Sequence, residues 1–303
     1  MKTLLIIGGG GFLGGSFFDY ATHYTLNKWH ITKIIFLSKK GKKFRKIKTK
    51  NKKIEFNYIK KNIKKIKTLP KCDYIIYAAN SSSNKENIDG VNNFINIIKK
   101  SSKEIKILFT SSGAVYGINN KIKKISENKK IILKKINKLN GYKINYAKTK
   151  LLMEKKIISL SKLNYKISIA RLFTFFGKRI LKDKKFAITN LLYSAKNNKR
   201  IKIYSNNNVF RSYMSSEDLV EWLLEILLAA GHKYQIFNVG SDKAISIKDL
   251  ALNICSIVNK KLVFSKNITK TIDFYVPSIE KAKNKLNLKI KRDLNLFLKQ
   301  ACN

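Results

Sequence analysis

Short apolar runs alternate with helical stretches through the first 170 residues, and this alternation restricts the possible folds most. The apolar runs lie at residues 4–7, 33–37, 54–59, 74–77, 105–109 and 167–170, and helical periodicity lies at 12–26, 87–100 and 146–163. Runs that are apolar at nearly every position indicate strands buried on both faces, as in a parallel sheet covered by helices. The pattern predicts a doubly wound α/β domain of about 175 residues.

The alternation loosens beyond Gly177, which indicates a second, smaller part. A lysine-rich segment is followed by an expected strand at 201–204, a helix at 217–230, a strand at 236–239, a helix from Ile247 and a polar C-terminal helix. We expect the first domain to comprise residues 1–177, with 207–240 returning to it. Residues 178–206 and 241–303 are expected to form the smaller, mostly C-terminal lobe.

The charge balance is strongly positive, with 64 Lys+Arg against 18 Asp+Glu and a formal net charge of +46. Six of the basic residues are arginine, which leaves 58 lysines. Such an excess is typical of proteins that bind nucleic acid or anionic surfaces. However, Lys is accompanied by abundant Ile and Asn, and the densest run, Lys39 to Lys67, has little aromatic spacing for base stacking. We therefore interpret the charge as compositional drift and expect no specific nucleic-acid partner.

Cysteine and histidine are too few and too dispersed for a metal site or a disulfide framework. The three cysteines are Cys72, Cys255 and Cys302, and the chain has three histidines. The first residues lack a signal-peptide cleavage pattern, and the longest apolar stretch, 219–230, is interrupted by two glutamates. These features predict a cytoplasmic protein with no bound metal and no membrane span.

A glycine run follows the first expected strand and begins the first expected helix. It reads Gly8-Gly9-Gly10-Gly11-Phe12-Leu13-Gly14 and satisfies both the GxGxxG and the GxxGxxG spacing. Glycines in this setting let the backbone approach a pyrophosphate at a helix N-terminus. The run predicts that the first domain is a Rossmann sheet that binds a dinucleotide such as NAD or NADP.

The end of the second expected strand bears on the choice between these cofactors. An NAD site usually has an acid there for the ribose hydroxyls, but this chain reads Phe36-Leu37-Ser38-Lys39-Lys40. Ser38 with adjacent lysines tolerates a 2′-phosphate, which shifts the prediction slightly from NAD towards NADP.

Tyr146 and Lys150 form a YxxxK pair, which puts a phenol and an ammonium one helical turn apart. Random placement of 14 tyrosines and 58 lysines gives about 2.7 such pairs, and the chain has two, the other being Tyr24 and Lys28. The spacing alone therefore carries no weight. The place of Tyr146 does, because it follows the fifth strand, which ends in Thr110-Ser111-Ser112-Gly113, and ligands bind at the carboxyl ends of such strands.

Several segments together resemble the extended short-chain dehydrogenase/reductase family of nucleotide-sugar epimerases, dehydratases and ketoreductases. They are GGGGFLGG, DYIIYAAN, SSGAVYG, NYAKTK, ARLFTFFG, FRSYMSSEDLV and FNVGSDKAISIKDLA, and they span nearly the whole chain. The resemblance implies a Rossmann domain with a smaller substrate lobe, a nucleotide-sugar substrate and a homodimer formed through the helices at 87–100 and 146–163.

The resemblance also implies roles for individual residues. Tyr146 is the expected acid/base, Lys150 the residue that holds the nicotinamide ribose, and Ser112 the hydrogen-bond donor to the substrate oxygen. Arg211 resembles the arginine that grips the pyrophosphate of the sugar nucleotide, the alternative being a surface ion pair with Glu217 or Asp218. The residues expected to line the cofactor are Gly8, Gly11, Phe12, Leu13, Gly14, Ser38, Ala78 and Ala79.

Departures from the family pattern narrow the expected chemistry. Dehydratases of the family have Asp-Glu after the serine or threonine, and decarboxylases tend to have a glutamate there, whereas this chain has Gly113 and Ala114. We therefore predict an epimerase or a 4-keto reductase in surface-polysaccharide synthesis, with a 4,6-dehydratase or decarboxylase as the alternative. Predictions of another class are a non-catalytic NADP-binding regulator and a binder of nucleic acid or anionic surfaces through the Lys39 to Lys67 run.

Overall fold

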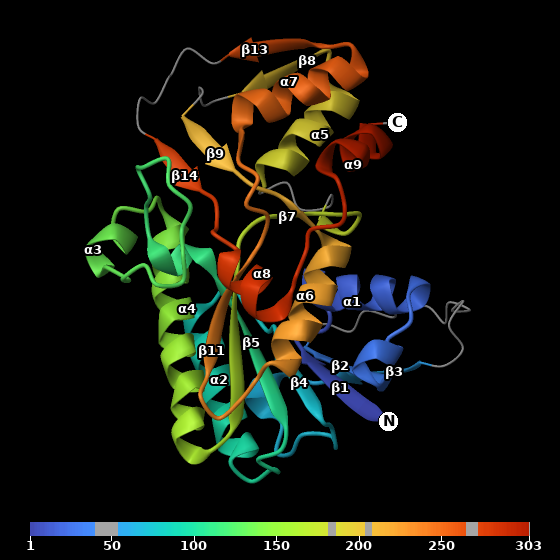
Figure 1. Cartoon of the computed structure of the whole chain (residues 1–303), viewed down its shortest axis with the longest axis vertical. Coiled ribbons are helices and arrows are strands. Elements are labelled where there is room, and N and C mark those ends of the chain that lie inside the picture. Colours follow the sequence, from blue (N-terminus) through green and yellow to red (C-terminus); the bar gives the residue numbers. More distant parts are fainter. Residues whose placement is uncertain (40–53, 181–185, 204–207, 265–271, 303) are drawn as a thin grey trace. The chain divides into compact units, whose positions relative to one another are not determined.

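The computed structural model describes residues 1–39, 54–180, 186–203, 208–264 and 272–302. Its largest sheet has seven strands in the order β11-β6-β5-β4-β1-β2-β3 (Figure 1). These strands are β1 (Lys2–Ile7), β2 (Ile31–Ser38), β3 (Glu55–Lys60), β4 (Tyr74–Tyr77), β5 (Lys106–Ser112), β6 (Lys166–Leu172) and β11 (Gln235–Val239).

The first strand is the point at which the strand order reverses. β1 pairs in parallel with β2 on one side and with β4 on the other, so that Leu5 lies between Ile35 and Ile75. β2–β3 and β4–β5 are also parallel. The prediction of a doubly wound parallel Rossmann sheet is therefore confirmed, and such sheets bind ligands at the strand ends beside this reversal.

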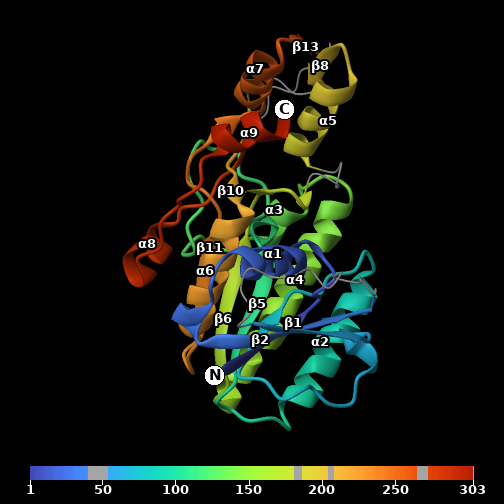
Figure 2. The same ribbon diagram turned by 90° about the vertical axis from the view of Figure 1, so that its right-hand side faces the viewer.

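Helices cover both faces of the sheet, as Figures 1 and 2 show. On one face, α2 (Asn84–Ile98) and α4 (Tyr142–Ile158) pack against each other. On the other face lie α1 (Phe12–His23) and α6 (Ser216–Leu228), where the Tyr20 hydroxyl donates to Glu221 over 3.1 Å. The strands are consequently apolar on both sides, which explains their nearly continuous hydrophobic runs.

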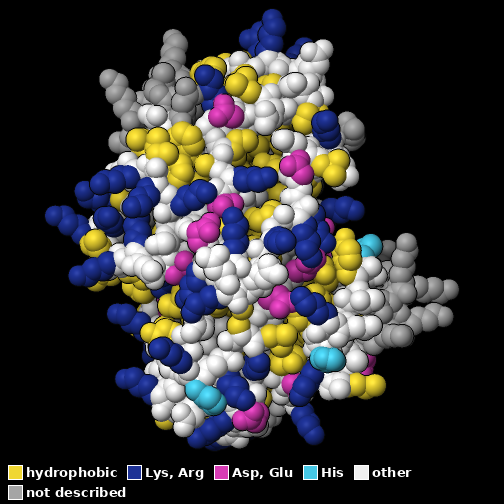
Figure 3. Space-filling view, in the orientation of Figure 1, with side chains coloured by type: hydrophobic (Ala, Val, Ile, Leu, Met, Phe, Trp, Pro, Cys, Tyr) yellow, Lys and Arg dark blue, Asp and Glu magenta, His cyan; other side chains and the backbone are white. Residues whose placement is uncertain are grey.

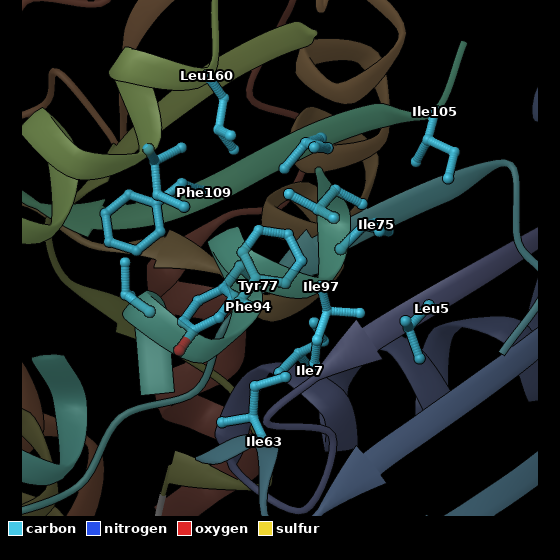
Figure 4. Packing of buried hydrophobic residues seen from close by; sticks show 14 of the residues in the cluster. Leu5, Ile7, Ile63, Ile75, Tyr77, Phe94, Ile97, Ile105, Phe109 and Leu160 are labelled. Atoms are coloured by element: carbon cyan, nitrogen blue, oxygen red, sulfur yellow. The ribbon is translucent and has the colours of Figure 1, made fainter. Parts of the chain in front are cut away.

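The core beneath α2 and α4 is aliphatic with a few aromatic rings (Figure 4). Leu5, Ile75 and Phe109 from the strands meet Phe94 from α2, and all four are buried. The Tyr77 and Phe94 ring centroids are 5.1 Å apart. This packed layer fixes the ends of β4 and β5, where the candidate functional residues begin.

The chain divides into two compact units. The first comprises residues 1–115, 140–171 and 220–237, and the second comprises 116–139, 172–219 and 238–303. These bounds differ from the predicted domains, because 116–139 belongs with the second unit and only 220–237 returns to the first. The assignment of cofactor and substrate roles to the parts stays a prediction.

The second unit contains helices packed on small sheets. Strands β8 and β13 pair in parallel, and β9 pairs with β12 and β14. The elements are α3 (Leu133–Ile136), β7 (Phe175–Phe176), α5 (Ala187–Asn197), β8 (Arg200–Ile203), β9 (Val209–Arg211), β10 (Met214–Ser215), β12 (Ile245–Ser246), α7 (Ile247–Val258), β13 (Lys261–Phe264), β14 (Asp273–Tyr275), α8 (Glu280–Leu286) and α9 (Leu294–Cys302). In the first unit, short 3-10 turns lie at Asn27–Trp29, Ile63–Lys65 and Ser159–Leu163, and the turn Gly113–Tyr116 begins in the first unit and ends in the second.

The helix α5 was not predicted. The sequence after Gly177 indicates only a lysine-rich segment, but the structure has α5 there, with Ile188, Leu191, Leu192 and Ala195 buried. This helix has no side-chain cap at Phe186, so the usual sequence signal for a helix start is missing. Two predicted features lie partly outside the described residues, namely 40–53 of the lysine run and Tyr204 of the strand expected at 201–204.

Basic side chains are spread over the face seen in Figure 3, with acidic ones among them. One cavity of about 620 Å³ in the second unit is lined by seven lysines, Lys121, Lys123, Lys124, Lys129, Lys134, Lys135 and Lys138. No helix in the described ranges is both long enough and apolar enough to cross a membrane. Within the same ranges, His, Cys, Asp and Glu form no cluster that could hold a metal ion.

Candidate active site and dinucleotide cradle

The glycine loop lies tightly between β1 and α1. Gly8 has a φ of +94°, and a Cβ there would lie 2.5 Å from the backbone nitrogen of Ala79. A Cβ on Gly14 would lie 2.1 Å from the carbonyl oxygen of Gly9. Side chains are therefore excluded at both positions, which lets β1, the loop and α1 approach one another closely.

Gly11 plays a different part in the same loop. It is the N-cap of α1 and offers no side-chain oxygen to the first-turn amides, which begin at Phe12 and Leu13. Among the described residues, a Cβ on Gly11 would have the Gly8 carbonyl oxygen alone within 4 Å, at 3.4 Å, so these residues leave the space beside the helix start open. An uncapped helix start beside open space suits a phosphate, because the amides and the helix dipole both favour an anion.

The residues that follow β4 complete this cradle. Ala78 donates its backbone N–H to the Ile7 carbonyl over 2.7 Å, and Ala79 contacts Gly8. Ser38 is the last residue of β2 and is half-buried. All eight predicted cofactor residues thus come from the ends of β1, β2 and β4 and the start of α1, and the arrangement fits a dinucleotide.

Ser112, Tyr146 and Lys150 lie together where β5 ends and α4 begins. Ser112 is the last residue of β5 and is buried, whereas Tyr146 and Lys150 are one turn apart on α4. The Lys150 Nζ is 6.0 Å from the centroid of the Tyr146 ring. The three predicted catalytic residues are therefore brought together by neighbouring elements of one unit.

Burial governs the charge states of this group. It raises the pKa of the Tyr146 phenol above its ordinary value, and a hydrogen bond with Ser112 acts in the opposite direction. Burial also lowers the pKa of Lys150 to about 8, while the negative charge of Glu154 opposes that effect. The Lys150 Nζ donates to the Thr110 carbonyl over 3.1 Å, which fixes the ammonium beside the phenol.

The second YxxxK pair forms no comparable group. Tyr24 lies just past the end of α1 and has 43% of its surface exposed. Lys28 makes an ion pair with Glu225, an acid of α6. The place of the pair in the fold, rather than its spacing, distinguishes the candidate tyrosine.

A buried ion pair behind Lys150 was missed by the sequence reasoning. Arg171 on β6 donates to both oxygens of Glu154 on α4, over 3.0 and 2.8 Å, and both side chains are at least 95% buried. Glu154 is one turn beyond Lys150 and keeps the pKa of that lysine from falling further. The available signal was that one of only six arginines lies in a mostly apolar strand.

Arg211 belongs to the second unit, where it is held by β14. Its guanidinium donates to the Asp273 carboxylate over 2.6 Å and lies 5.8 Å from the Tyr275 ring centroid. The ion pair is therefore with Asp273, and the expected alternative of Glu217 or Asp218 is wrong. Asp218 instead accepts from the Arg292 guanidinium over 2.6 Å.

The two positions after Ser112 carry no acid. Gly113 and Ala114 begin the 3-10 turn, and the Ala114 N–H donates to the Ser112 hydroxyl over 3.2 Å. The serine is thus oriented by its own turn rather than by a neighbouring carboxylate.

A doubly wound sheet with a glycine loop at its strand reversal is the arrangement in which Rossmann domains bind dinucleotides, and the serine, tyrosine and lysine group lies in the same unit. The chain belongs to the NAD dependent epimerase/dehydratase family, which matches residues 4–240. It is thereby a member of the extended short-chain dehydrogenase/reductase proteins, as the sequence predicts.

The chain is also similar in sequence to two curated proteins. The chain is 26% identical over 286 residues to dTDP-D-glucose 4,6-dehydratase of Dictyostelium discoideum, covering 85% of this chain and 62% of that protein. It is 27% identical over 125 residues to UDP-glucuronic acid decarboxylase 4 of Arabidopsis thaliana, covering 41% of this chain and 28% of that one. The matched parts thus make up less than two thirds of either relative.

Solved structures share the fold across the whole chain. A dTDP-glucose 4,6-dehydratase from Bacillus anthracis, in complex with NAD, has a TM-score of 0.79 and 17% identity, with 100% of this chain and 96% of that chain covered. A UDP-N-acetylglucosamine 4-epimerase from Methanobrevibacter ruminantium has a TM-score of 0.76 and 18% identity, with 99% and 97% covered. Enzymes of different reaction types therefore share this architecture.

Proposed function

We propose that this chain transfers hydride between NAD(P) and a ring carbon of a nucleotide-activated sugar, as an epimerase or a 4-keto reductase. The observation that carries the proposal is the group of Ser112, Tyr146 and Lys150 where β5 ends and α4 begins, in the same unit as a glycine loop that fits a dinucleotide. Arg211 is proposed to bind the pyrophosphate of the substrate. It would either keep its ion pair with Asp273 or exchange that pair for the pyrophosphate.

The proposed chemistry moves one proton and one hydride. As a ring C–H and its O–H become a carbonyl, Tyr146 accepts the hydroxyl proton, and Ser112 donates a hydrogen bond to the same oxygen. A bound nicotinamide supplies the acceptor for the hydride in this direction and the donor in reverse. Lys150 stabilises the phenolate by its positive charge, since a tyrosine otherwise ionises near pH 10.

Dehydration is the alternative reaction. One of the two curated relatives is a 4,6-dehydratase, but the residues that follow Ser112 do not favour elimination of water. Elimination of water needs a further acid and base, but Gly113 and Ala114 follow Ser112. Supplying dTDP-glucose tests the alternative. A 4-keto-6-deoxy product would replace the proposed reaction, whereas its absence, together with turnover of other sugar nucleotides, supports an epimerase or reductase.

The nucleotide held by the purified protein separates the two favoured reactions. An epimerase reoxidises its cofactor in every turnover and keeps it, whereas a reductase exchanges it. Denaturing the protein and analysing the supernatant by mass spectrometry should release about one NAD⁺ per chain from an epimerase. A protein that releases none and oxidises reduced cofactor with keto-sugar nucleotides is a reductase.

A further inference from the structure

The end of β2 lacks the acid that usually binds the hydroxyls of the adenosine ribose, but an acid from another element is close by. Lys39, the first residue after β2, makes an ion pair with Glu86 on α2, with 2.7 Å between Nζ and Oε2. The two residues are 47 positions apart in the sequence. The lysine that the sequence offers to a 2′-phosphate is therefore already paired with a carboxylate.

Glu86 occupies a helix-capping position without using its carboxylate for capping. Ser83 is the N-cap of α2 and accepts from the Glu86 N–H over 3.3 Å, which is the backbone half of a capping box. In a complete box the glutamate would turn back to the Ser83 N–H. Here that N–H donates to Ser81, and the Glu86 carboxylate instead accepts from the Ser81 hydroxyl over 2.5 Å and from Lys39. Helix capping thus does not explain where this carboxylate lies.

The contacts of Glu86 put its carboxylate on the cofactor side of the sheet. Ser81 belongs to the loop after β4, whose Ala79 contacts Gly8, and Lys39 follows β2. β4 and β2 are the two neighbours of β1, so the carboxylate bridges the strand ends on either side of the glycine loop. Asn87 holds this loop by two hydrogen bonds with the Ser81 backbone, over 2.7 and 2.9 Å.

One oxygen of this carboxylate remains for a ligand. Both contacts use Oε2, and Oε1 has no hydrogen-bond partner within the described part of the chain. The side chain is 37% exposed. An ionised carboxylate with an unused oxygen is suited to accept hydrogen bonds from the ribose hydroxyls of NAD.

We propose that Glu86, carried by α2, replaces the missing acid of β2 as the ribose-binding residue, and that its carboxylate makes the chain prefer NAD to NADP. The inference rests on the proposed function and reverses the slight preference for NADP that Ser38 alone suggests. It also favours the epimerase over the reductase, because epimerases retain NAD.

Charge explains why NADP is disfavoured. A 2′-phosphate carries a charge of about −1.5 to −2 at neutral pH. The Glu86 carboxylate would repel it, and Lys39 is already paired with that carboxylate. The hydrogen bonds from Lys39 and Ser81 lower the pKa of Glu86, so that it stays ionised. Specificity then comes from repulsion of the phosphate as well as from attraction of the hydroxyls.

Calorimetric titration with NAD⁺ and NADP⁺ of the purified protein, after any nucleotide that it retains has been removed, tests this inference without an activity assay. We expect tighter binding of NAD⁺, and we expect Glu86→Gln to reduce the ratio of the two affinities by roughly tenfold or more. Asp89→Asn is the matched control, because Asp89 lies one turn further along α2 and pairs with Lys64 over 2.9 Å. It should leave the ratio unchanged.

A second variant, Lys39→Ala, allows the inference to be tested if Glu86→Gln folds poorly. Lys39→Ala removes an exposed side chain and should weaken NADP⁺ further while changing NAD⁺ little. The inference is overturned if the unmodified protein prefers NADP⁺, or if Glu86→Gln leaves the ratio unchanged. Binding of neither cofactor by the unmodified protein would instead overturn the proposed function itself.

Discussion

At the scale of single residues, the environment decides which of many similar side chains does chemistry. The chain has 14 tyrosines and 58 lysines. Among the described residues, the Tyr146 and Lys150 pair combines a half-buried phenol, a buried ammonium and a neighbouring serine at the end of a strand. The same YxxxK spacing at Tyr24 lies on the surface, which makes it a natural control.

Removing the Tyr146 hydroxyl should abolish proton transfer without disturbing the cofactor. We expect Tyr146→Phe to lower kcat by roughly 10²- to 10⁴-fold, while dinucleotide binding measured by calorimetry stays the same. Tyr24→Phe should leave kcat unaffected. Full activity of Tyr146→Phe would exclude this tyrosine as the acid/base.

The buried ammonium of Lys150 should make stability depend on pH. Its pKa is about 8 in the folded chain and 10.5 ordinarily, so the unfolded chain holds more protons between these values. Unfolding free energy should therefore rise with pH through this window, by up to about 1.4 kcal/mol per pH unit. Replacing Lys150 by Met removes the cost of burying this charge. Denaturant titrations should therefore show that Lys150→Met raises the free energy of unfolding more at pH 7 than at pH 10.5. An equal difference at both pH values would contradict the lowered pKa.

At the scale of elements, α4 and β6 are joined by the buried Glu154–Arg171 pair. Removing one partner leaves the other charge buried and unpaired, so Glu154→Gln or Arg171→Met should each lower the free energy of unfolding by about 3–5 kcal/mol. The double variant should be much less destabilised than the sum. Additive losses in chemical denaturation would show that the two side chains act independently.

The glycine loop allows binding and folding to be separated. Gly11→Ala should fold normally, because its new methyl group has only the Gly8 oxygen at 3.4 Å, but it should weaken dinucleotide binding by filling the phosphate space. Gly14→Ala places a methyl group against the Gly9 backbone and should cost about 1–3 kcal/mol of stability. Thermal melting and calorimetry on both variants check this, and equal effects on stability would be inconsistent with the loop geometry.

The sequence predicted the elements of the first unit well, because buried parallel strands are apolar at consecutive positions. The expected strand at 74–77 agrees with Tyr74–Tyr77, and the helix expected from residue 146 begins at Tyr142. The small sheets of the second unit could not be predicted, since β8 and β13 are far apart in the sequence and only four residues long each. The helix α5 lacks a capping signal.

The candidate site, too, contains residues that the sequence predicted and contacts that it did not. Ser112, Tyr146 and Lys150 were predicted from the family resemblance of the segments that contain them, and the structure brings the three residues together. The pairings of Lys39 with Glu86 and of Arg171 with Glu154 join residues from different elements, and nothing local specifies them. Among 58 lysines, only the fold selects the one that meets Glu86.

At the scale of the whole molecule, the net charge of +46 remains interpreted as compositional. If so, no single cluster should dominate the binding of polyanions. Replacing Lys121, Lys134 and Lys138 of the lysine-lined cavity by Gln should reduce the salt needed for elution from heparin as much as replacing the exposed and scattered Lys103, Lys162 and Lys233. A much larger loss from the cavity variant would indicate a dedicated polyanion site.

Hydride transfer through the cofactor is the central claim, and isotope transfer tests it most directly. Nucleotide sugars deuterated at the reacting ring carbon would be incubated with the purified protein, and the nicotinamide would then be examined by mass spectrometry. The account predicts that, in samples quenched during turnover, deuterium lies on the reduced nicotinamide with the unmodified chain and not with Tyr146→Phe, and that an epimerase returns this deuterium to the sugar when it reoxidises the cofactor. Conversion of the sugar with loss of its deuterium to water would contradict it.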